Sequence, residues 1–224
     1  MITSTKVQAQ VKQFQQFDIA VENFKTMSGQ LPGDTEYFTL GAGANCGSSV
    51  GDNDGTIEGT MSGSGATVVT YSCEIPGFWN HLSQNGFGSI VFSMDASTLG
   101  VVEDIHAPQL KIGSGESIAY GVSGTNYYHA LDHVDLSEDL DSQNNPSFLA
   151  SEALALDSKM DDSVANTGDI IAIGDSDNVK DATTNAAAGS AGCVITGNLG
   201  TYNVTYSSAE MCQLRINMLS QTTD

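Results

Sequence analysis

The sequence predicts an α+β protein in which one long N-terminal helix packs on an antiparallel β-sheet. Apolar residues recur at steps of three or four near the N-terminus, as on one face of a helix. Short β-prone runs follow one another in the second half of the chain, after a long Gly-rich region. No long flexible linker separates these parts, so we predict a single domain over residues 1–224. The helix is expected at residues 1–28, the loop region at 31–115, and the sheet with the C-terminal region at 116–224.

The N-terminal helix is expected to bury one face. Its apolar positions trace a stripe with the helical period of 3.6 residues: Val7, Val11, Phe14, Phe17, Val21, Phe24 and Met27. Gly29 can adopt the left-handed conformation that ends a helix, and Pro32 keeps Leu31 out of the helical region, so the helix should end near Ser28. A helix of about 25 residues is about 37 Å long. We expect part of it to project beyond the domain; a core helix covered along its whole length is the alternative.

The loop region is expected to pack on the domain surface and to contain one short helix. Residues 75–82 include the only tryptophan, Trp79, and enter the helix through Pro76 and Gly77. Trp79 and Leu82 lie three residues apart and therefore share a helical face. This segment is the clearest regular element that we expect between the long helix and the sheet.

The second half of the chain carries strand signals interrupted by one helix signal. In chain order we expect strands at 117–122 and 126–131, a helix at 148–160, and strands at 170–173 and 212–218. Ser147 is expected to cap the helix, because a serine side chain accepts a hydrogen bond from an N–H of the first turn. Apolar and polar residues alternate in the last strand, which predicts that one of its faces is buried and the other exposed.

The charge of the chain is strongly acidic and unevenly distributed. Seven Lys and Arg stand against 27 Asp and Glu, a net charge of −20. Residues 1–30 hold three lysines against Asp18 and Glu22, which gives +1; residues 31–224 hold 4 basic and 25 acidic groups, which gives −21. Nucleic acid is excluded as an expected partner, because phosphate binding needs clustered Lys and Arg. An acidic surface instead favours solubility and attracts cations.

The four cysteines predict two disulfides in an exported protein. They are widely spaced without a CxxC pair, which disfavours a zinc site or a thioredoxin-like motif: Cys46, Cys73, Cys193 and Cys212. Four cysteines allow three connectivities. We favour pairing Cys46 with Cys73 and Cys193 with Cys212, because each pair brackets a Gly-rich loop. Closing loops of this size stabilises a fold by about 3 kcal/mol each in the chain-entropy model. Four buried free thiols in a cytosolic protein are the alternative.

Four segments together resemble those of bacterial type IV pilin-like proteins, the prepilin-type filament subunits. In the order shown by that family they are the long helix running into Leu31-Pro32-Gly33-Asp34, then Phe78-Trp79-Asn80-His81-Leu82, then residues 155–162 (Ala-Leu-Asp-Ser-Lys-Met-Asp-Asp), then Thr167-Gly168-Asp169. The set spans most of the chain. The resemblance implies a pilin-like fold, with a long helix-to-sheet loop and a C-terminal region closed by a disulfide.

The resemblance also implies a function. It implies a non-catalytic, structural subunit of an extracellular type IV pilus, or of a related secretion or uptake filament, on the surface of a bacterium. Other pilin subunits would be its partners, in a homopolymer or a heteropolymer. The family is anchored in the membrane before assembly through an apolar half-helix, which would precede residue 1. The 224 residues contain no apolar run of transmembrane length and no signal peptide, so membrane contact is expected only through that segment.

An acidic turn at residues 51–58 is the best candidate for a cation site. Aligned on a calcium loop, Asp52 and Asp54 fall at ligand positions 3 and 5, whereas Val50 and Met61 occupy positions 1 and 12. Two interpretations are therefore open: a plain acidic turn without an ion, and calcium binding by Asp52, Asp54 and Glu58. A calcium-dependent cell-surface binding module or adhesin is the alternative function. We expect no other cofactor.

The remaining polar clusters have weaker chemical signals. Asp157 and Asp161 lie one helical turn apart, and we expect Asp161 and Asp162 to accept backbone N–H groups in the turn before Thr167. An ion is the alternative there, as it is at the acidic turn of residues 175–177.

A catalytic site is not expected. His129 and His133 are four residues apart and share a face of a helix or strand, but no third metal ligand is evident. The chain shows no nucleophile elbow with recognisable partners and no phosphate-binding loop. An enzyme is therefore the third hypothesis, after the filament subunit and the adhesin.

Overall fold

The fold is α+β, as predicted, with an N-terminal helix and a four-stranded antiparallel sheet. A computed structural model describes residues 4–41, 46, 50–59, 70–96, 100–122, 124–134, 136, 140, 145–174, 192–195, 198–205 and 210–218. The elements are α1 (Ser4–Ser28), α2 (Glu74–Gln84), β1 (Glu116–Val122), β2 (Thr125–Leu131), α3 (Ala150–Met160), β3 (Ile170–Gly174), β4 (Val194–Ile195), β5 (Asn198–Tyr202) and β6 (Cys212–Asn217). The main sheet has the order β1-β2-β6-β3, and β4 pairs with β5 in a small second sheet. None of the described helices has the length and hydropathy needed to cross a lipid bilayer.

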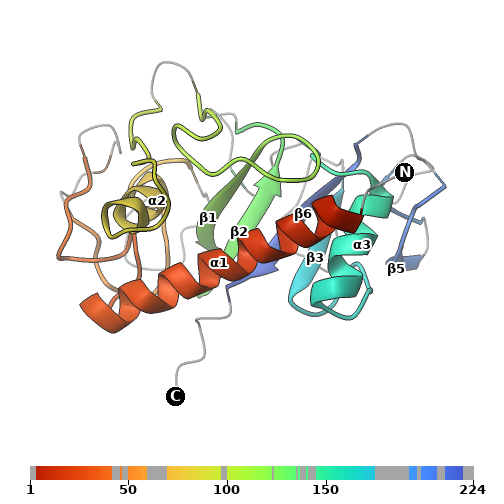
Figure 1. The fold of residues 1–224 in the computed structure, drawn as a ribbon, viewed down its shortest axis with the longest axis horizontal. Coiled ribbons are helices and arrows are strands. Elements are labelled where there is room, and N and C mark those ends of the chain that lie inside the picture. Colours follow the sequence, from red (N-terminus) through yellow and green to blue (C-terminus); the bar gives the residue numbers. More distant parts are fainter. Residues whose placement is uncertain are drawn as a thin grey trace.

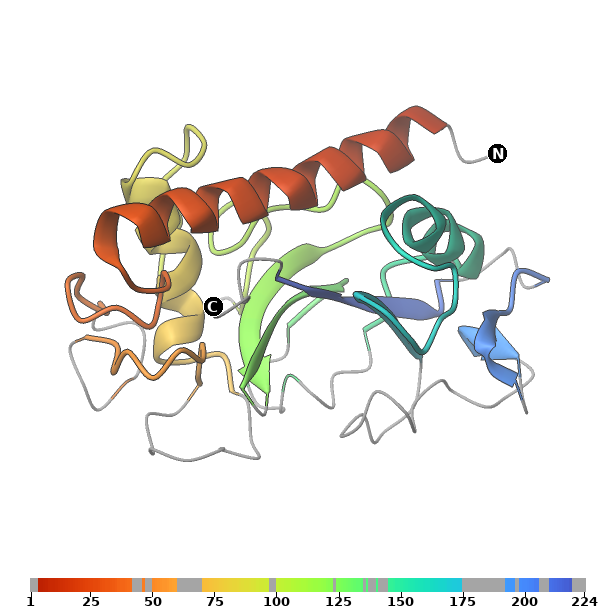
Figure 2. The ribbon, with the colours of Figure 1, turned by 90° about the horizontal axis from the view of Figure 1, so that it is seen from below.

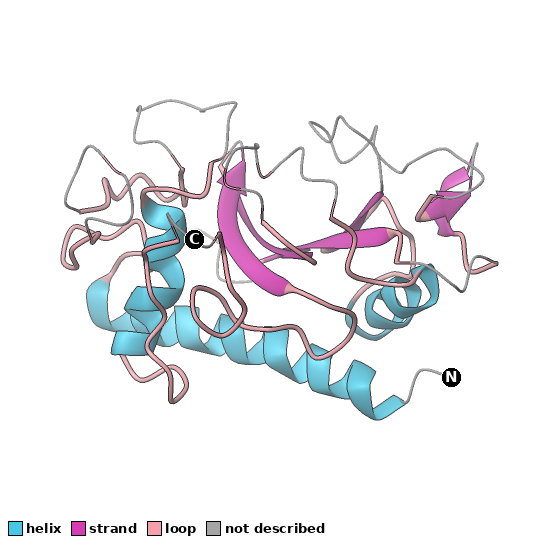
Figure 3. Ribbon diagram, turned by 90° about the horizontal axis from the view of Figure 1, so that it is seen from above, coloured by secondary structure: helices cyan, strands magenta, loops and turns pink. Residues whose placement is uncertain are grey.

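Helix α1 runs along one side of the main sheet (Figures 1 and 2). Helix α2 lies near the C-terminal end of α1. Helix α3 lies near the N-terminal end of α1, on the same side of the sheet (Figure 3). The buried side chains of α1 extend from Val7 to Phe24. The expected projection of this helix is therefore wrong for the described residues, because its inner face is covered from Val7, in the first turn, to Phe24, about one turn before the end.

The end of α1 follows the predicted glycine rule. Gly29 has a φ of 75°, in the left-handed region, and its N–H donates to the Lys25 carbonyl at 2.7 Å. The helix ends at Ser28 as predicted. One member of the predicted stripe differs, since Met27 is 68% exposed whereas the stripe is otherwise buried or partly buried.

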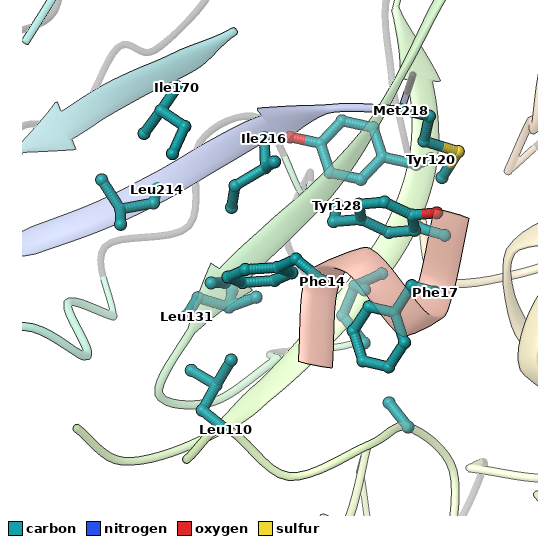
Figure 4. Packing of buried hydrophobic residues seen from close by; sticks show 14 of the residues in the cluster. Phe14, Phe17, Leu110, Tyr120, Tyr128, Leu131, Ile170, Leu214, Ile216 and Met218 are labelled. Atoms are coloured by element: carbon teal, nitrogen blue, oxygen red, sulfur yellow. The ribbon is translucent and has the colours of Figure 1, made fainter. Parts of the chain in front are cut away.

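The core forms where α1 meets the sheet (Figure 4). Phe14 and Phe17 point from α1 toward Tyr128 of β2, and the Phe17 ring lies 4.6 Å from the Trp79 ring of α2. Leu214 and Ile216 of β6 face the same side. Large aromatic side chains thus join α1, α2 and the sheet, which stabilises this junction by burying apolar area.

Strand β6 differs from the prediction of one exposed face. Its register pairs Arg215 with His129, so Gln213 and Arg215 lie on the face opposite α1, yet both side chains are buried. The Arg215 guanidinium lies 5.6 Å from the Tyr120 ring centroid, which suits a cation–π contact. Apolar and polar residues do alternate along β6, but the polar side chains of Gln213 and Arg215 are buried as well.

The predicted cap of α3 is wrong. The helix begins at Ala150, and the Leu149 N–H is bound by the Glu152 carboxylate at 3.0 Å. Ser147 lies before this turn, buried, with a hydroxyl that has no hydrogen-bond partner within the described structure. Glu152 lies three residues into the segment and does the capping, as acidic residues in a first turn commonly do.

Both disulfides have the predicted pairing. Cys46 is bonded to Cys73, immediately before α2, and Cys193 is bonded to Cys212, the first residue of β6. The alternative of four free thiols is therefore wrong. The second bond closes the C-terminal region by joining the segment before β4 to the main sheet.

Candidate functional sites

The segment that follows α1 is fixed by a histidine of α2. The Gly33 N–H donates to His81 Nδ1 at 3.0 Å. Burial lowers the pKa of His81 to about 4, so the ring is a neutral acceptor at neutral pH. Gly33 has a φ of 88°, and a Cβ at this position would lie 2.6 Å from the Glu74 carbonyl oxygen. The two sequence motifs at residues 31–34 and 78–82 therefore meet in space, which fixes the position of Asp34.

The acidic turn wraps around Asp34. The Asp34 carboxylate accepts the Asp54 N–H at 3.1 Å and the Gly55 N–H at 2.9 Å, while its backbone carbonyl accepts the Asn53 N–H at 2.9 Å. Asn53 and Gly55 both have positive φ values, 58° and 92°, which bend the turn tightly enough to present these donors.

Three carboxylates converge at this turn. One oxygen from each of Asp34, Asp52 and Asp54 lies within 4.8 Å of the others. Asp34 is 1% exposed, whereas Asp52 and Asp54 reach the surface. The structure therefore brings the two predicted aspartates together, and it adds Asp34, which sequence reasoning missed as a ligand. No local spacing could have indicated Asp34, because 17 residues separate it from Asp52.

Two glutamates lie beside the three aspartates. Glu74 is fully buried and accepts the Asp52 N–H at 3.1 Å and the Glu58 N–H at 3.0 Å. Glu58 is 7% exposed, and its Oε2 is buried without a hydrogen-bond partner within the described structure. Residues 26–110 contain no Lys or Arg. Glu58, which was predicted as a ligand, therefore lies beside the cluster but is not one of the three residues whose oxygens lie within 4.8 Å of one another.

Burial raises the pKa values of the buried carboxyls in this acidic group. Burial and the charges of Asp54 and Asp52 raise the pKa of Asp34 to about 7, although the Gly55 and Asp54 N–H donors lower it. Burial likewise raises the pKa of Glu74 to about 8 and raises the pKa of Glu58. Carboxylates gathered in this way need a proton or a cation to offset their repulsion. Oxygen-only donors of this kind suit hard cations such as calcium.

The carboxylates of a second acidic cluster accept hydrogen bonds from the chain, as those of Asp34, Asp52 and Asp54 do. Asp157, Asp161 and Asp162 also lie within 4.8 Å of one another through one oxygen each. Asp157 accepts the Ser163 N–H and the Tyr202 hydroxyl. Asp161 accepts the Ile170 N–H. Asp162 accepts the Val164 N–H and the Thr167 hydroxyl. The expected backbone hydrogen bond in the turn before Thr167 is confirmed for Asp162, whereas Asp161 accepts the N–H of Ile170, which lies after that turn. Residues 175–177, the other acidic turn, lie outside the described part of the chain.

The histidine pair does not form a metal site. His129 is buried, and its Nδ1 lies 3.1 Å from the Tyr120 hydroxyl, while its Nε2 lies 2.8 Å from Gln213 Oε1. Burial and the nearby Arg215 charge lower the pKa of His129 to about 3. Both ring nitrogens are occupied, and His133 is exposed at the other end of the segment.

The outer face of α1 is the second candidate site. We call Ile19, Asn23 and Met27 the outer ridge, because they are four residues apart on the side of α1 away from the sheet. Ile19 is 60% exposed, and Tyr37 beside the ridge is 69% exposed. Two adjoining hollows of about 440 and 330 Å³ both include Phe24, Met27 and Asn85. The ridge thus combines exposed apolar side chains with two adjoining hollows.

Comparisons with known proteins do not assign this chain to a family. It matches no protein-family model, no curated protein sequence and no solved structure with statistical significance.

Proposed function

We propose that this chain is a structural subunit of an extracellular bacterial filament of the type IV pilus kind, or of a related secretion or uptake filament. The four sequence segments that resemble this family support the proposal. The α+β arrangement with a long N-terminal helix on an antiparallel sheet agrees with it. Two disulfides also suit an exported protein, because such bonds persist in oxidising compartments.

The outer ridge is the observation that carries this proposal. Helix α1 buries one apolar face on its own sheet, and it presents Ile19 and Met27 on another. Both side chains line one hollow, and clustered apolar surface of this kind favours a contact with another protein. We infer that the contact is a neighbouring subunit, because residues 1–30 sum to +1 while the remainder sums to −21. Two copies of so acidic a protein repel each other least when they approach along α1.

Filament assembly tests the proposal. In the native bacterium, the gene is replaced by an Ile19→Glu/Met27→Glu variant, and sheared surface filaments are examined by immunogold electron microscopy. We expect the parent protein in labelled filaments and the variant in the membrane fraction, folded but unassembled, because charge on the ridge opposes burial. An Ile195→Glu/Val204→Glu variant is the matched control, since both residues are exposed near the small sheet.

Two results would contradict the proposal. One is antibody labelling of the cell surface without filaments, and the other is normal assembly of the ridge variant. The genomic reading frame gives a cheaper test, because the family resemblance requires a short basic leader and about 20 apolar residues ahead of residue 1. An ordinary cytosolic start would contradict it.

A calcium-dependent cell-surface binding module or adhesin is the second candidate function. The carboxylate group around Asp34 favours it, since a cation there would order a surface turn. Such a module would act without polymerising, so surface labelling without filaments would support it over the filament subunit.

A further inference from the structure

We propose that Asp34, Asp52 and Asp54 bind one calcium ion, with Glu58 as a further ligand. The site would join the turn at residues 51–55 to the segment that follows α1. This inference is independent of filament assembly, because it concerns a ligand of the single domain.

The spacing of the oxygens permits a shared ion. Calcium binds oxygen ligands at about 2.3–2.6 Å, so two ligands of the same ion are at most about 5 Å apart. The carboxylate oxygens of Asp34, Asp52 and Asp54 lie within 4.8 Å of one another. They therefore already meet the distance requirement for ligands of one ion.

Glu58 provides an independent indication of a ligand. Its Oε2 is buried without a hydrogen-bond partner within the described structure, and a buried carboxylate oxygen left in this way is costly. Glu74 holds the backbone of Glu58 and that of Asp52 together, through one oxygen each. Glu58 and Asp52 therefore lie side by side on Glu74, which places Glu58 next to the cluster. A cation there would give the unpaired oxygen a partner.

The surroundings favour calcium over a basic side chain or magnesium. No Lys or Arg occurs between Lys25 and Lys111, so the sequence around the cluster supplies no positive charge. Calcium accepts six to eight oxygens in irregular geometry, whereas magnesium requires a near-octahedral set. The Asp52 and Asp54 carboxylates are exposed, which leaves the ion an entry path, and the Cys46–Cys73 disulfide closes the segment that carries them.

Calcium titration of the purified, EDTA-treated protein tests the site. Isothermal titration calorimetry with calcium chloride should show one ion bound with a Kd of about 10⁻⁴–10⁻³ M, as in extracellular modules. The thermal unfolding midpoint should rise with calcium, because the ion binds only the folded chain. Magnesium chloride at equal ionic strength should give a smaller rise.

Two variants and one control locate the ion. The Asp52→Asn/Asp54→Asn variant should bind calcium at least about tenfold more weakly, while its unfolding midpoint in EDTA equals or exceeds that of the parent, because like-charge repulsion is removed. Glu58→Gln should weaken binding as well, and it serves as the second variant. Asp161→Asn/Asp162→Asn removes the same charge from the second acidic cluster and should keep the parent's affinity.

Three outcomes would overturn the proposal. They are no binding by the parent at about 10 mM calcium, ten times the weakest affinity expected; equal affinity in the parent and the Asp52→Asn/Asp54→Asn variant; and loss of binding in the Asp161→Asn/Asp162→Asn control alone. None of these results depends on whether the protein forms filaments.

Discussion

Glu116 gives the sharpest test of the electrostatics of the core. It is the first residue of β1, it is 1% exposed, and its Oε1 has no hydrogen-bond partner within the described structure. Burial, together with the charges of Glu103 and Asp132, raises the pKa of this carboxyl from 4.5 to about 8, although a Val134 N–H lowers it. The folded protein therefore holds a proton on Glu116 at neutral pH.

The Glu116→Gln substitution should stabilise the protein increasingly as pH rises. The folded state binds the Glu116 proton more tightly than the unfolded chain does, so the parent's stability is fully present below pH 4.5 and is lost as pH rises through about 8. At 1.36 kcal/mol per pKa unit the loss is about 3 kcal/mol at pH 7 and at most about 5 kcal/mol above pH 8. Gln is neutral throughout this range, so the variant escapes the loss.

Urea unfolding between pH 4 and pH 9 measures this difference. The fluorescence of Trp79, the only tryptophan and a fully buried one, reports the transition, and urea adds no ionic screening. Glu36→Gln, at an exposed position, is the matched control and should follow the parent within about 0.5 kcal/mol. Parallel stability curves for the parent and Glu116→Gln would refute the assignment of a protonated, buried Glu116.

Three further predictions concern the core, the disulfide and a histidine. Phe17→Ala should cost about 3–5 kcal/mol of unfolding free energy, by loss of apolar contacts and creation of a cavity, whereas Ile19→Ala on the outer ridge should change it by less than about 0.5 kcal/mol; urea unfolding compares them. Cys193→Ser/Cys212→Ser should lower stability by about 3 kcal/mol, because a loop with a sequence separation of 19 residues is no longer closed, and thermal unfolding should show a lower midpoint. The pKa of His81 is lowered from 6.5 to about 4, so its stabilisation is present above pH 6.5 and is lost as pH falls toward 4; an NMR titration of its ring should show no change above about pH 5.

The sequence predicted the elements whose signals are local. The stop at Gly29 needs only the glycine and the proline that follows, and the strands at 116–122 and 125–131 need only a β-prone run and a turn. The disulfide pairing was favoured because each pair brackets a Gly-rich loop, and the structure has that pairing. These features depend on neighbours within a few residues, or on a chain closure of modest length, and both can be counted along a sequence.

Features that depend on tertiary contacts were missed. The role of Asp34 arises because His81 holds Gly33, 48 residues away in the chain, and the turn at 51–55 then folds over it. Strand β6 looked half-exposed because Gln213 and Arg215 are polar, yet His129 and Tyr120 across the sheet supply their partners. Burial of a polar group depends on what covers it, and a periodicity of two cannot show that.

The segment that follows α1 connects the two proposed sites. Asp34 belongs to the carboxylate group, while Phe38, four residues later, lines a hollow on the outer ridge and lies 5.5 Å from the His81 ring. The same His81 binds Gly33, so one imidazole holds both ends of this short segment. A cation that pins Asp34 would therefore also restrain Tyr37 and Phe38, and thus the surface that we propose for a neighbouring subunit. If both proposals hold, subunit contact along the ridge should strengthen with calcium, and the Asp52→Asn/Asp54→Asn variant should lose that dependence while its ridge stays unchanged.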